Sequence, residues 1–228
     1  MKTLIQTTFT SLEQTKLFYE KLNFQIHEYE DLLIANDGIV QISLTNKKFM
    51  RKGIVIYSDT LVEQIETVQN EFDVLENKDV YILSSPCGVW VYVYRGRGKD
   101  FLLNTAPSSI LGNYAGLSLE SLNLDHSIQF WTELGFELQM GSVDQGWLTM
   151  VNRGGFMLSI MQALNCPHQF FNPSLTYFNG KDNEAVIQKI RDQKVMITEE
   201  ITVFNDKNIV DNVVLRDPMG LGFFVFND

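Results

Sequence analysis

The spacing of hydrophobic residues changes from helical to strand-like several times along the first part of the chain. Residues 11–24 follow a helical period, and short apolar runs with strand character lie on both sides of this segment. The helical face carries Thr15, Phe18, Tyr19 and Leu22. Strands are expected over residues 3–9, 24–30, 32–35 and 39–44. The Asn36-Asp37-Gly38 segment supplies the positive φ angles of a tight hairpin. The pattern predicts one strand, one helix and then three strands.

The same pattern returns later in the chain. Residues 123–136 repeat residues 11–24, and both segments end in an aromatic pair followed by Leu-x-Phe. Ser11 and Asn123 are residue types that cap helix N-termini, so each begins a predicted helix. Strands are expected around the second helix over 116–121, 136–140, 147–151 and 156–161.

A fainter repeat joins residues 85–94 with residues 217–226. In each, a Pro-x-Gly turn leads into a strongly apolar strand. Upstream of each turn, the pattern predicts a strand over 54–57 or 175–178, then a helix and two further strands. One helical face runs over 61–68 and the other over 186–190, the second with Asp182 as a suitable N-cap. The last of these strands are expected over 72–75, 80–83, 197–204 and 209–215. The chain therefore contains four copies of a βαβββ unit.

These units pair into two domains, residues 1–95 and 113–228, and the Gly-, Pro- and Ser-containing segment 96–112 is the predicted linker. The fold class is α+β. Helices cover one face of each curved mixed sheet, so the opposite face forms a concave cup.

The composition narrows the classes of partner. The net charge is −10, from 28 acidic and 18 basic residues, which argues against nucleic acid and against an anionic membrane surface. No apolar run is long enough to span a bilayer, and residues 1–6 lack the apolar core of a signal peptide. The two cysteines, Cys87 and Cys166, suit a reducing compartment. We expect a cytoplasmic protein. A homodimer is compatible with the sequence, including one that exchanges units between chains.

The repeated motifs resemble the vicinal-oxygen-chelate superfamily of glyoxalases, extradiol dioxygenases and bleomycin-resistance proteins. The matching pieces are the helix endings Phe18-Tyr19…Leu22-Asn23-Phe24 and Phe130-Trp131…Leu134-Gly135-Phe136, with the turn Asp217-Pro218-Met219-Gly220. The resemblance covers nearly the whole chain. It implies two tandem domains with cups, but the fold hosts many chemistries and does not fix a function.

The resemblance also implies a divalent metal held by three side chains of one cup. Counting from the helix and turn motifs places the equivalent positions at Leu4, Gly53 and Tyr92 in the first domain, and at Gly116, Ser174 and Phe224 in the second. Neither these residues nor their immediate neighbours include His, Asp, Glu or Cys, the ligands that such ions require. We therefore predict no metal and no other cofactor. His27, His126 and His168 are interpreted as surface or loop histidines.

Strand alternation predicts which side chains face the cups. Mostly aromatic walls with a few polar groups are typical of a small-molecule pocket. The candidate ligand-binding residues are Gln6, Trp90, Tyr92, Ser118, Glu120, Thr176, Phe178 and Phe224. The small residues Gly116, Ser118 and Gly222 favour an open second cup. For the first cup, filled and open states are equally compatible with the sequence.

Three functions remain open at this stage. The first is a metal-free protein that binds a small, aromatic or partly apolar molecule. The second is a glyoxalase- or dioxygenase-like enzyme with an atypical site, in which Glu120 is the weak candidate for a catalytic base or instead lies in water at the cup rim. The third is a structural or regulatory module whose cups are filled. Whether the protein is an enzyme is left undecided by the sequence.

Overall fold

The first half of the chain forms one mixed sheet of eight strands. The computed structural model describes residues 1–29, 32–96, 98 and 108–227. The first sheet consists of β1 (Lys2–Thr8), β2 (Gln25–Tyr29), β3 (Leu32–Asn36), β4 (Gln41–Thr45), β5 (Gly53–Tyr57), β6 (Val74–Asn77), β7 (Val80–Ser84) and β8 (Trp90–Tyr94). Their order is β2-β3-β4-β1-β5-β8-β7-β6, so two βαβββ units meet where β1 pairs antiparallel with β5.

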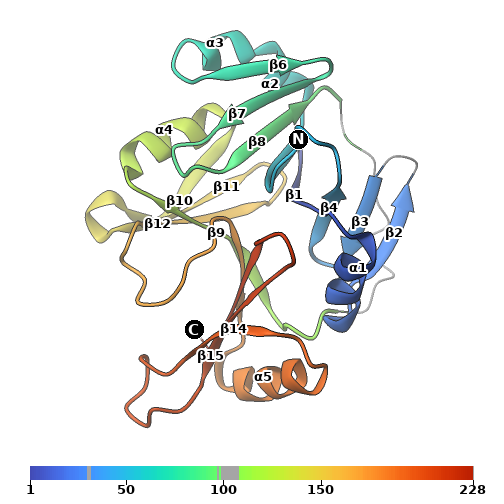
Figure 1. Cartoon of the computed structure of the whole chain (residues 1–228). Helices are drawn as coiled ribbons and strands as arrows, with labels where there is room; N and C mark the ends of the chain where they lie inside the picture. Colours follow the sequence, from blue (N-terminus) through green and yellow to red (C-terminus); the bar gives the residue numbers. More distant parts are fainter. Residues whose placement is uncertain (30–31, 97, 99–107, 228) are drawn as a thin grey trace.

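The second half repeats this topology. Its sheet consists of β9 (Tyr114–Ser121), β10 (Phe136–Ser142), β11 (Trp147–Asn152), β12 (Met157–Gln162), β13 (Ser174–Phe178), β14 (Ile197–Ile201), β15 (Asn212–Arg216) and β16 (Gly222–Phe226). The order is β10-β11-β12-β9-β13-β16-β15-β14, which matches the first sheet strand for strand. The predicted α+β class with two tandem domains is confirmed (Figure 1). Much of the predicted linker, residues 97 and 99–107, lies outside the described residues.

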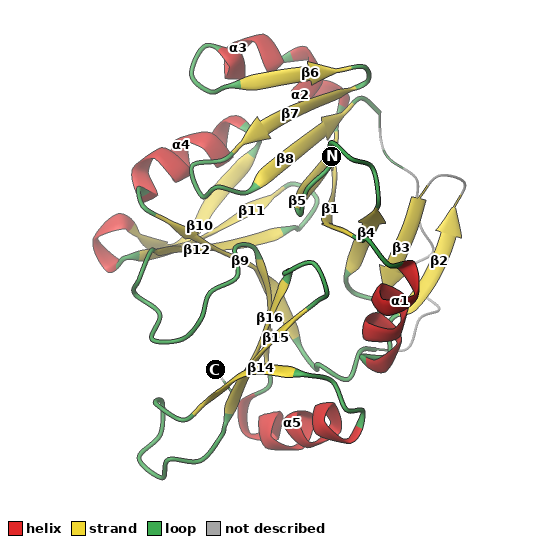
Figure 2. Cartoon of the chain, viewed as in Figure 1, coloured by secondary structure: helices red, strands yellow, loops and turns green. Residues whose placement is uncertain are grey.

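The helices lie around the two sheets, as Figure 2 shows. They are α1 (Leu12–Lys21), α2 (Asp59–Glu63), α3 (Ile65–Gln69), α4 (Leu124–Glu133) and α5 (Asn183–Asp192), with short 3-10 turns at Val143–Gln145 and Gly180–Asp182. Both predicted N-caps of the repeated helix are confirmed. The Ser11 hydroxyl accepts the N–H of Gln14 at 3.3 Å, and the Asn123 side chain accepts that of His126 at 3.0 Å.

One prediction about local structure is wrong. The helix expected over 61–68 is split at Gln64 into α2 and α3. Asp182 is the N-cap residue of α5, as predicted, but its side chain makes no capping hydrogen bond with the described residues, and Asp182 ends the 3-10 turn that leads into the helix.

The last two predicted strands are shorter than expected because residues 202–211 form a loop between β14 and β15. The side chain of Asn205 accepts the N–H groups of Lys207 and Ile209, at 3.0 and 3.2 Å. Such local side-chain bonds stabilise a turn in place of the sheet ladder. This loop carries Phe204 toward the second cup.

One continuous hydrophobic core joins the helix-bearing faces of the two sheets. Each domain contributes an aromatic side chain to the other domain. Phe18 of α1 packs on Phe223 of β16 with ring centroids 5.6 Å apart, and Phe130 of α4 meets Phe72 at 5.0 Å. These contacts use the aromatic pair of each repeated helix, so the repeat motif serves the packing between domains as well as within them.

A buried carboxylate ties the second domain to the first. Asp217, in the Asp-Pro-Met-Gly turn, accepts the hydroxyls of Thr7 at 2.8 Å and Tyr19 at 3.2 Å. The same side chain accepts the backbone N–H groups of Met219 and Leu221, each at 2.8 Å. Burial is the main cause that raises the pKa of Asp217 above its ordinary value, and these hydrogen bonds act against it.

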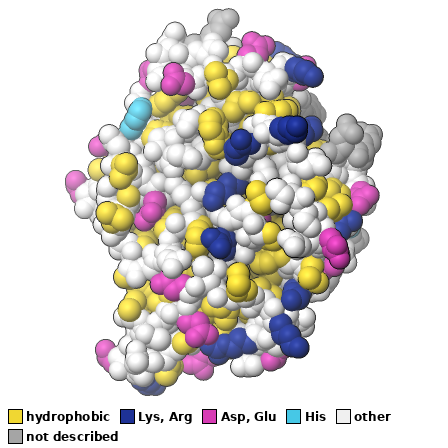
Figure 3. Space-filling model, in the orientation of Figure 1, with side chains coloured by type: hydrophobic (Ala, Val, Ile, Leu, Met, Phe, Trp, Pro, Cys, Tyr) yellow, Lys and Arg dark blue, Asp and Glu magenta, His cyan; other side chains and the backbone are white. Residues whose placement is uncertain are grey.

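The surface is mixed in character. On the face drawn in Figure 3, basic side chains gather across the middle and acidic ones lie mostly around the outline, with hydrophobic patches between them. Among the described residues, no helix is long and apolar enough to cross a membrane.

Candidate functional site

A half-open cavity of about 540 Å³ lies against the concave face of the second sheet. Alternating residues of two neighbouring strands form its back wall, because every second side chain of a strand points to the same face. Thr176 and Phe178 of β13 lie beside Phe224 and Phe226 of β16 in the parallel ladder. The full lining consists of Ser118, Met161, Asn165, Cys166, Pro167, His168, Phe170, Thr176, Phe178, Phe204, Phe224, Phe226 and Asn227.

Residues 163–173, between β12 and β13, carry aromatic side chains over the cavity. The His168 ring centroid lies 5.0 Å from those of both Phe224 and Phe226. Phe170 lies 4.9 Å from Phe224 in an edge-to-face arrangement. Edge-to-face and stacked pairs at these distances stabilise one another, so the strands and the loop form a joined aromatic wall.

Two hydroxyl groups stand out within this aromatic wall. The oxygens of Ser118 on β9 and Thr176 on β13 lie 2.6 Å apart, and the two residues are only 6% and 5% exposed. Both line the cavity. They provide a fixed, buried polar point against which a ligand can be oriented.

The cavity lining contains no Asp, Glu, Lys or Arg. Burial, with a smaller effect of the nearby charge of Glu120, raises the pKa of the Cys166 thiol to about 11. This thiol is therefore protonated at neutral pH and is a poor nucleophile there. The site offers hydrophobic contact and hydrogen bonding to a ligand.

Glu120 does not line this cavity. Its carboxylate accepts the backbone N–H of Leu164 at 3.2 Å, and its backbone carbonyl accepts the side-chain amide of Asn172 at 3.0 Å. Leu164 and Asn172 both belong to the loop over the cavity. Glu120 thus holds the two ends of this loop at the cup rim, the second of the two positions considered for it.

The small residues that favoured an open second cup act differently from expectation. Gly222 does not create space in the cavity: a Cβ there would lie 2.1 Å from the Ser174 hydroxyl and 2.8 Å from the Cβ of Phe171. Gly116 lines a groove between the domains instead of the cavity. Of the three, Ser118 alone lines the cavity, so the expectation for the two glycines is wrong.

The metal positions implied by the family resemblance do not fit a divalent ion. In the second cup, Gly116 has no side chain, Phe224 offers a ring, and the Ser174 hydroxyl donates to the carbonyl of Phe171 at 2.5 Å. Hard and borderline divalent ions need imidazole or carboxylate ligands. Within residues 1–29, 32–96, 98 and 108–227, no group of three or more His, Cys, Asp or Glu is placed to hold a metal.

The first cup is filled by its own side chains. Leu4, Val55 and Tyr92 lie side by side in one buried cluster, and Met50 packs against them from the loop after β4. The Tyr92 hydroxyl accepts the N–H of Arg51 at 2.7 Å. The side-chain amide of Gln6 donates to the Arg51 carbonyl at 2.9 Å. Trp90 packs half-buried against the same cluster.

The structure therefore separates the sequence-predicted residues into three groups. Ser118, Thr176, Phe178 and Phe224 come together around the cavity. Gln6, Trp90 and Tyr92 lie in the filled first cup, where Gln6 and Tyr92 bond to its closing loop. Glu120 lies at the rim of the second cup.

The loop residues around the second cavity were missed by the strand pattern. His168 lies in a loop, as predicted, but the strand pattern did not indicate that its ring would contact the back wall of the cavity. Phe170 and Phe204 come from two loops that are separated by most of a βαβββ unit. The available signal was the unusual density of aromatic residues in segment 168–171, since loop segments are normally polar.

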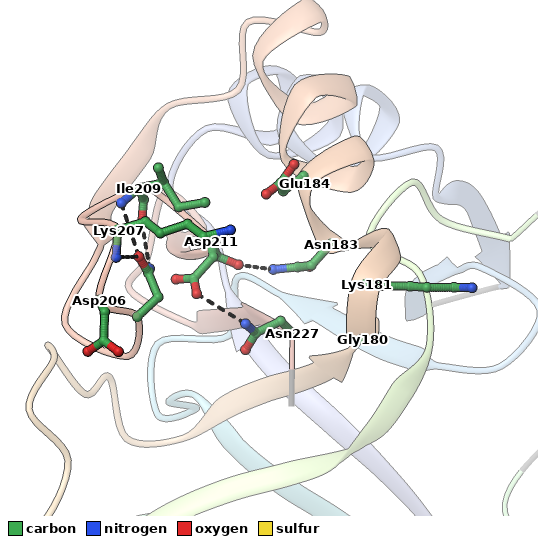
Figure 4. A pocket seen from close by; sticks show the side chains of 10 residues that line it. Gly180, Lys181, Asn183, Glu184, Asp206, Lys207, Ile209, Asp211 and Asn227 are labelled. Atoms are coloured by element: carbon green, nitrogen blue, oxygen red, sulfur yellow. Dashed lines mark hydrogen bonds between the residues drawn. The ribbon is translucent and has the colours of Figure 1, made fainter.

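Two other hollows lie outside the second cup. A polar hollow of about 290 Å³ lies beside the start of α5 (Figure 4). Its groups bond to one another: Asp211 accepts the amide of Asn227 at 3.1 Å and, through its carbonyl, that of Asn183 at 2.6 Å. A groove of about 660 Å³ lies between the domains, at the start of β1 and β9.

The topology defines the class of fold: two paired βαβββ units in each of two domains make the vicinal-oxygen-chelate fold. Solved structures that resemble the chain include extradiol dioxygenases. A catechol 2,3-dioxygenase aligns with a TM-score of 0.57 at 13% identity, covering 97% of this chain and 85% of the other. The 2,3-dioxygenase LapB from Pseudomonas sp. KL28 gives 0.58 at 12%, covering 97% and 89%.

A variant of homoprotocatechuate 2,3-dioxygenase from B. fuscum gives a TM-score of 0.63 at 12% identity, covering 99% of this chain and 70% of the other. No family model and no curated protein matches the sequence. At such identities the similarity establishes the fold and leaves the function to the residues of the cups.

Proposed function

We propose that this protein binds a small, aromatic or partly apolar molecule in the second cup without using a metal. The observation that carries the proposal is the cavity of about 540 Å³ with six aromatic rings and a buried hydroxyl pair. Pockets of roughly 300–1,000 Å³ with apolar walls and few polar groups are typical of small-molecule sites. The positions that hold a metal in the enzymes offer no suitable ligand here, which favours binding over metal-assisted chemistry.

The remaining enzymatic reading requires a catalytic base in the cup. Glu120 is the only carboxylate among the predicted site residues, and it bonds to the loop at Leu164 without lining the cavity. A candidate base must reach the proton that it removes. The arrangement of Glu120 therefore supports a role in positioning the loop.

The proposal is tested by a thermal-shift screen of uncharged and charged aromatic compounds, followed by calorimetric titration of the hits. A ligand at a hundred times its Kd stabilises the fold by about 2.7 kcal/mol. For a chain of this size we expect a rise in Tm of roughly 5 °C or more. Elemental analysis of the purified protein, made in parallel, measures bound metal directly.

A matched pair of variants locates the site. Gln6 and Ser118 occupy corresponding positions, each opposite the first residue of the neighbouring strand. Ser118→Leu places a branched side chain in the cavity and should reduce affinity at least about tenfold, a loss of 1.4 kcal/mol. Gln6→Leu alters the filled cup and should leave affinity unchanged. Equal loss in both variants, or a stoichiometric metal that restores binding, would overturn the proposal.

A further inference from the structure

We propose that the ligand of the second cup is an uncharged, planar aromatic molecule that presents a hydrogen-bond acceptor, such as a carbonyl or a ring nitrogen, to the hydroxyl pair of Ser118 and Thr176. This inference rests on the proposed binding function and specifies the chemistry of the ligand. Three independent observations carry it: the charge of the lining, the count of hydroxyl protons and the shape of the wall.

The lining of the cavity disfavours a charged ligand. None of its residues is an Asp, Glu, Lys or Arg, and Cys166 keeps its proton at neutral pH. Glu120, whose charge acts on Cys166, does not line the cavity, and its carboxylate accepts the backbone N–H of Leu164. A ligand ion that leaves water for this cavity would lose its hydration and meet no Asp, Glu, Lys or Arg as a partner in the lining, which is unfavourable by on the order of several kcal/mol. An uncharged molecule avoids this loss.

The hydroxyl pair favours a ligand that carries a hydrogen-bond acceptor. Ser118 and Thr176 together carry two hydroxyl protons, and their mutual bond of 2.6 Å uses one of them. The other proton has no acceptor among the described residues, although both side chains are more than nine-tenths buried. Buried donors without a partner are rarer and more costly than under-used acceptors. A carbonyl or ring-nitrogen lone pair on the ligand would satisfy this donor.

The aromatic wall selects for a flat molecule. Phe224 and Phe226 are stacked with an angle of 12° between planes and centroids 5.2 Å apart. His168 meets both rings edge-on. Parallel faces bounded by an edge form a surface on which a planar ring can lie, and aromatic pairs prefer such offset or edge-to-face geometries.

The test uses four naphthalene derivatives of nearly equal shape at pH 8. They are 2-acetylnaphthalene, the apolar 2-ethylnaphthalene, the anion 2-naphthoate and the cation 2-naphthylmethylammonium. Calorimetric or fluorescence titration of the full chain should show 2-acetylnaphthalene binding at least about tenfold more tightly than the other three, since a site built for a hydrogen bond disfavours analogues without it.

The double variant Ser118→Ala with Thr176→Val removes both hydroxyls and almost no volume. It should bring the Kd of 2-acetylnaphthalene to within threefold of that of 2-ethylnaphthalene, whose own affinity stays the same. A matched control exists in the same domain. Ser121 and Ser127 form a second buried hydroxyl pair, 2.7 Å apart, which is not part of the cavity lining. Ser121→Ala with Ser127→Ala should preserve the tenfold preference.

The outcomes separate the two proposals. If none of the four compounds binds at millimolar concentration, the proposed function fails, and this inference fails with it. If 2-naphthoate or the ammonium compound binds as tightly as the ketone, the function stands and the inference is overturned. Persistence of the ketone preference in the Ser118–Thr176 double variant would also overturn it.

Discussion

The two cups of this protein are built from the same βαβββ units, and one is filled while the other contains a half-open cavity. In the first, the short loop 46–52 lies across the sheet and inserts Met50 among Leu4, Val55 and Tyr92. In the second, the longer loop 163–173 spans the mouth and contacts the back wall through His168 and Phe170. The two cups therefore differ both in the strand side chains that line them and in the loop that closes them.

Side-chain length at matched positions explains how each loop is held. Gln6 is long enough to reach the carbonyl of Arg51 and draws the first loop onto the sheet. Ser118, at the corresponding position, reaches only to Thr176, 2.6 Å away. The second loop is held from the rim by Glu120 instead, so the space above the sheet stays open.

The largest change in stability is expected when one aromatic residue in each cup is replaced by alanine. Tyr92→Ala leaves a cavity inside a closed cluster and removes the partner of the Arg51 N–H, so we expect a loss of about 3–5 kcal/mol in the free energy of unfolding. Phe224→Ala enlarges a cavity that already exists, so about 2–3 kcal/mol is expected. Urea unfolding measures both values. A larger loss for Phe224→Ala would mean that the second cup is the more tightly packed one.

A smaller effect is expected for the matched polar residues. Gln6→Ala removes the bond to the Arg51 carbonyl and the packing of the Gln6 stem, for a loss of about 1–2 kcal/mol. Ser118→Ala removes only the bond to Thr176 and should cost about 0.5–1 kcal/mol. Urea unfolding measures both losses. Unchanged m-values would show that both variants still unfold in a two-state transition. Equal losses would contradict the idea that Gln6 holds a loop and Ser118 does not.

The role of Glu120 is tested through ligand kinetics. Glu120→Ala removes the acceptor for Leu164 N–H and should loosen the loop, so the dissociation rate of a bound ligand rises about three- to fivefold, as loss of one hydrogen bond permits. Glu120→Gln keeps an acceptor oxygen and serves as the control, with little change expected. Stopped-flow displacement gives both rates. A fall in turnover without a change in dissociation would instead indicate a catalytic carboxylate.

The two Pro-x-Gly turns should differ in how their contribution to stability depends on pH. Ser85 in the first turn accepts the N–H of Val89 with a neutral hydroxyl, whereas Asp217 in the second accepts that of Leu221 with a buried carboxyl group. Burial raises the pKa of Asp217 in the folded protein. As the pH rises, Asp217 therefore loses its proton in the unfolded chain before it does so in the folded protein. Over the pH range between these two pKa values, the contribution of Asp217 to the free energy of unfolding decreases.

Asp217→Asn removes this titration. Wild-type stability relative to the variant should be highest below the unfolded pKa of about 4 and should decrease as the pH rises through the higher folded pKa. Thermal unfolding at a series of pH values measures the difference, with Ser85→Ala as a variant that has no carboxyl group to titrate. A difference that grows in favour of the wild type with rising pH would show that the hydrogen bonds to Asp217 outweigh its burial.

Local patterns in the sequence were sufficient for the fold. The repeated helix with its aromatic pair, the caps Ser11 and Asn123, and the two Pro-x-Gly turns predicted four units in two domains. Alternation also predicted that Thr176, Phe178 and Phe224 share a face, because the direction of a side chain in a strand depends only on its position along that strand.

The state of each cup was decided by tertiary structure alone. Nothing in the local pattern indicates that Arg51 would bond to Gln6 and Tyr92, or that the His168 ring would lie against Phe204 and Phe226. Gly222 was expected to leave space in the second cup, but the side chains of Ser174 and Phe171 occupy the space beside it. A loop finds its place through contacts with residues far away in the chain, and such contacts leave no period in the sequence that could predict them.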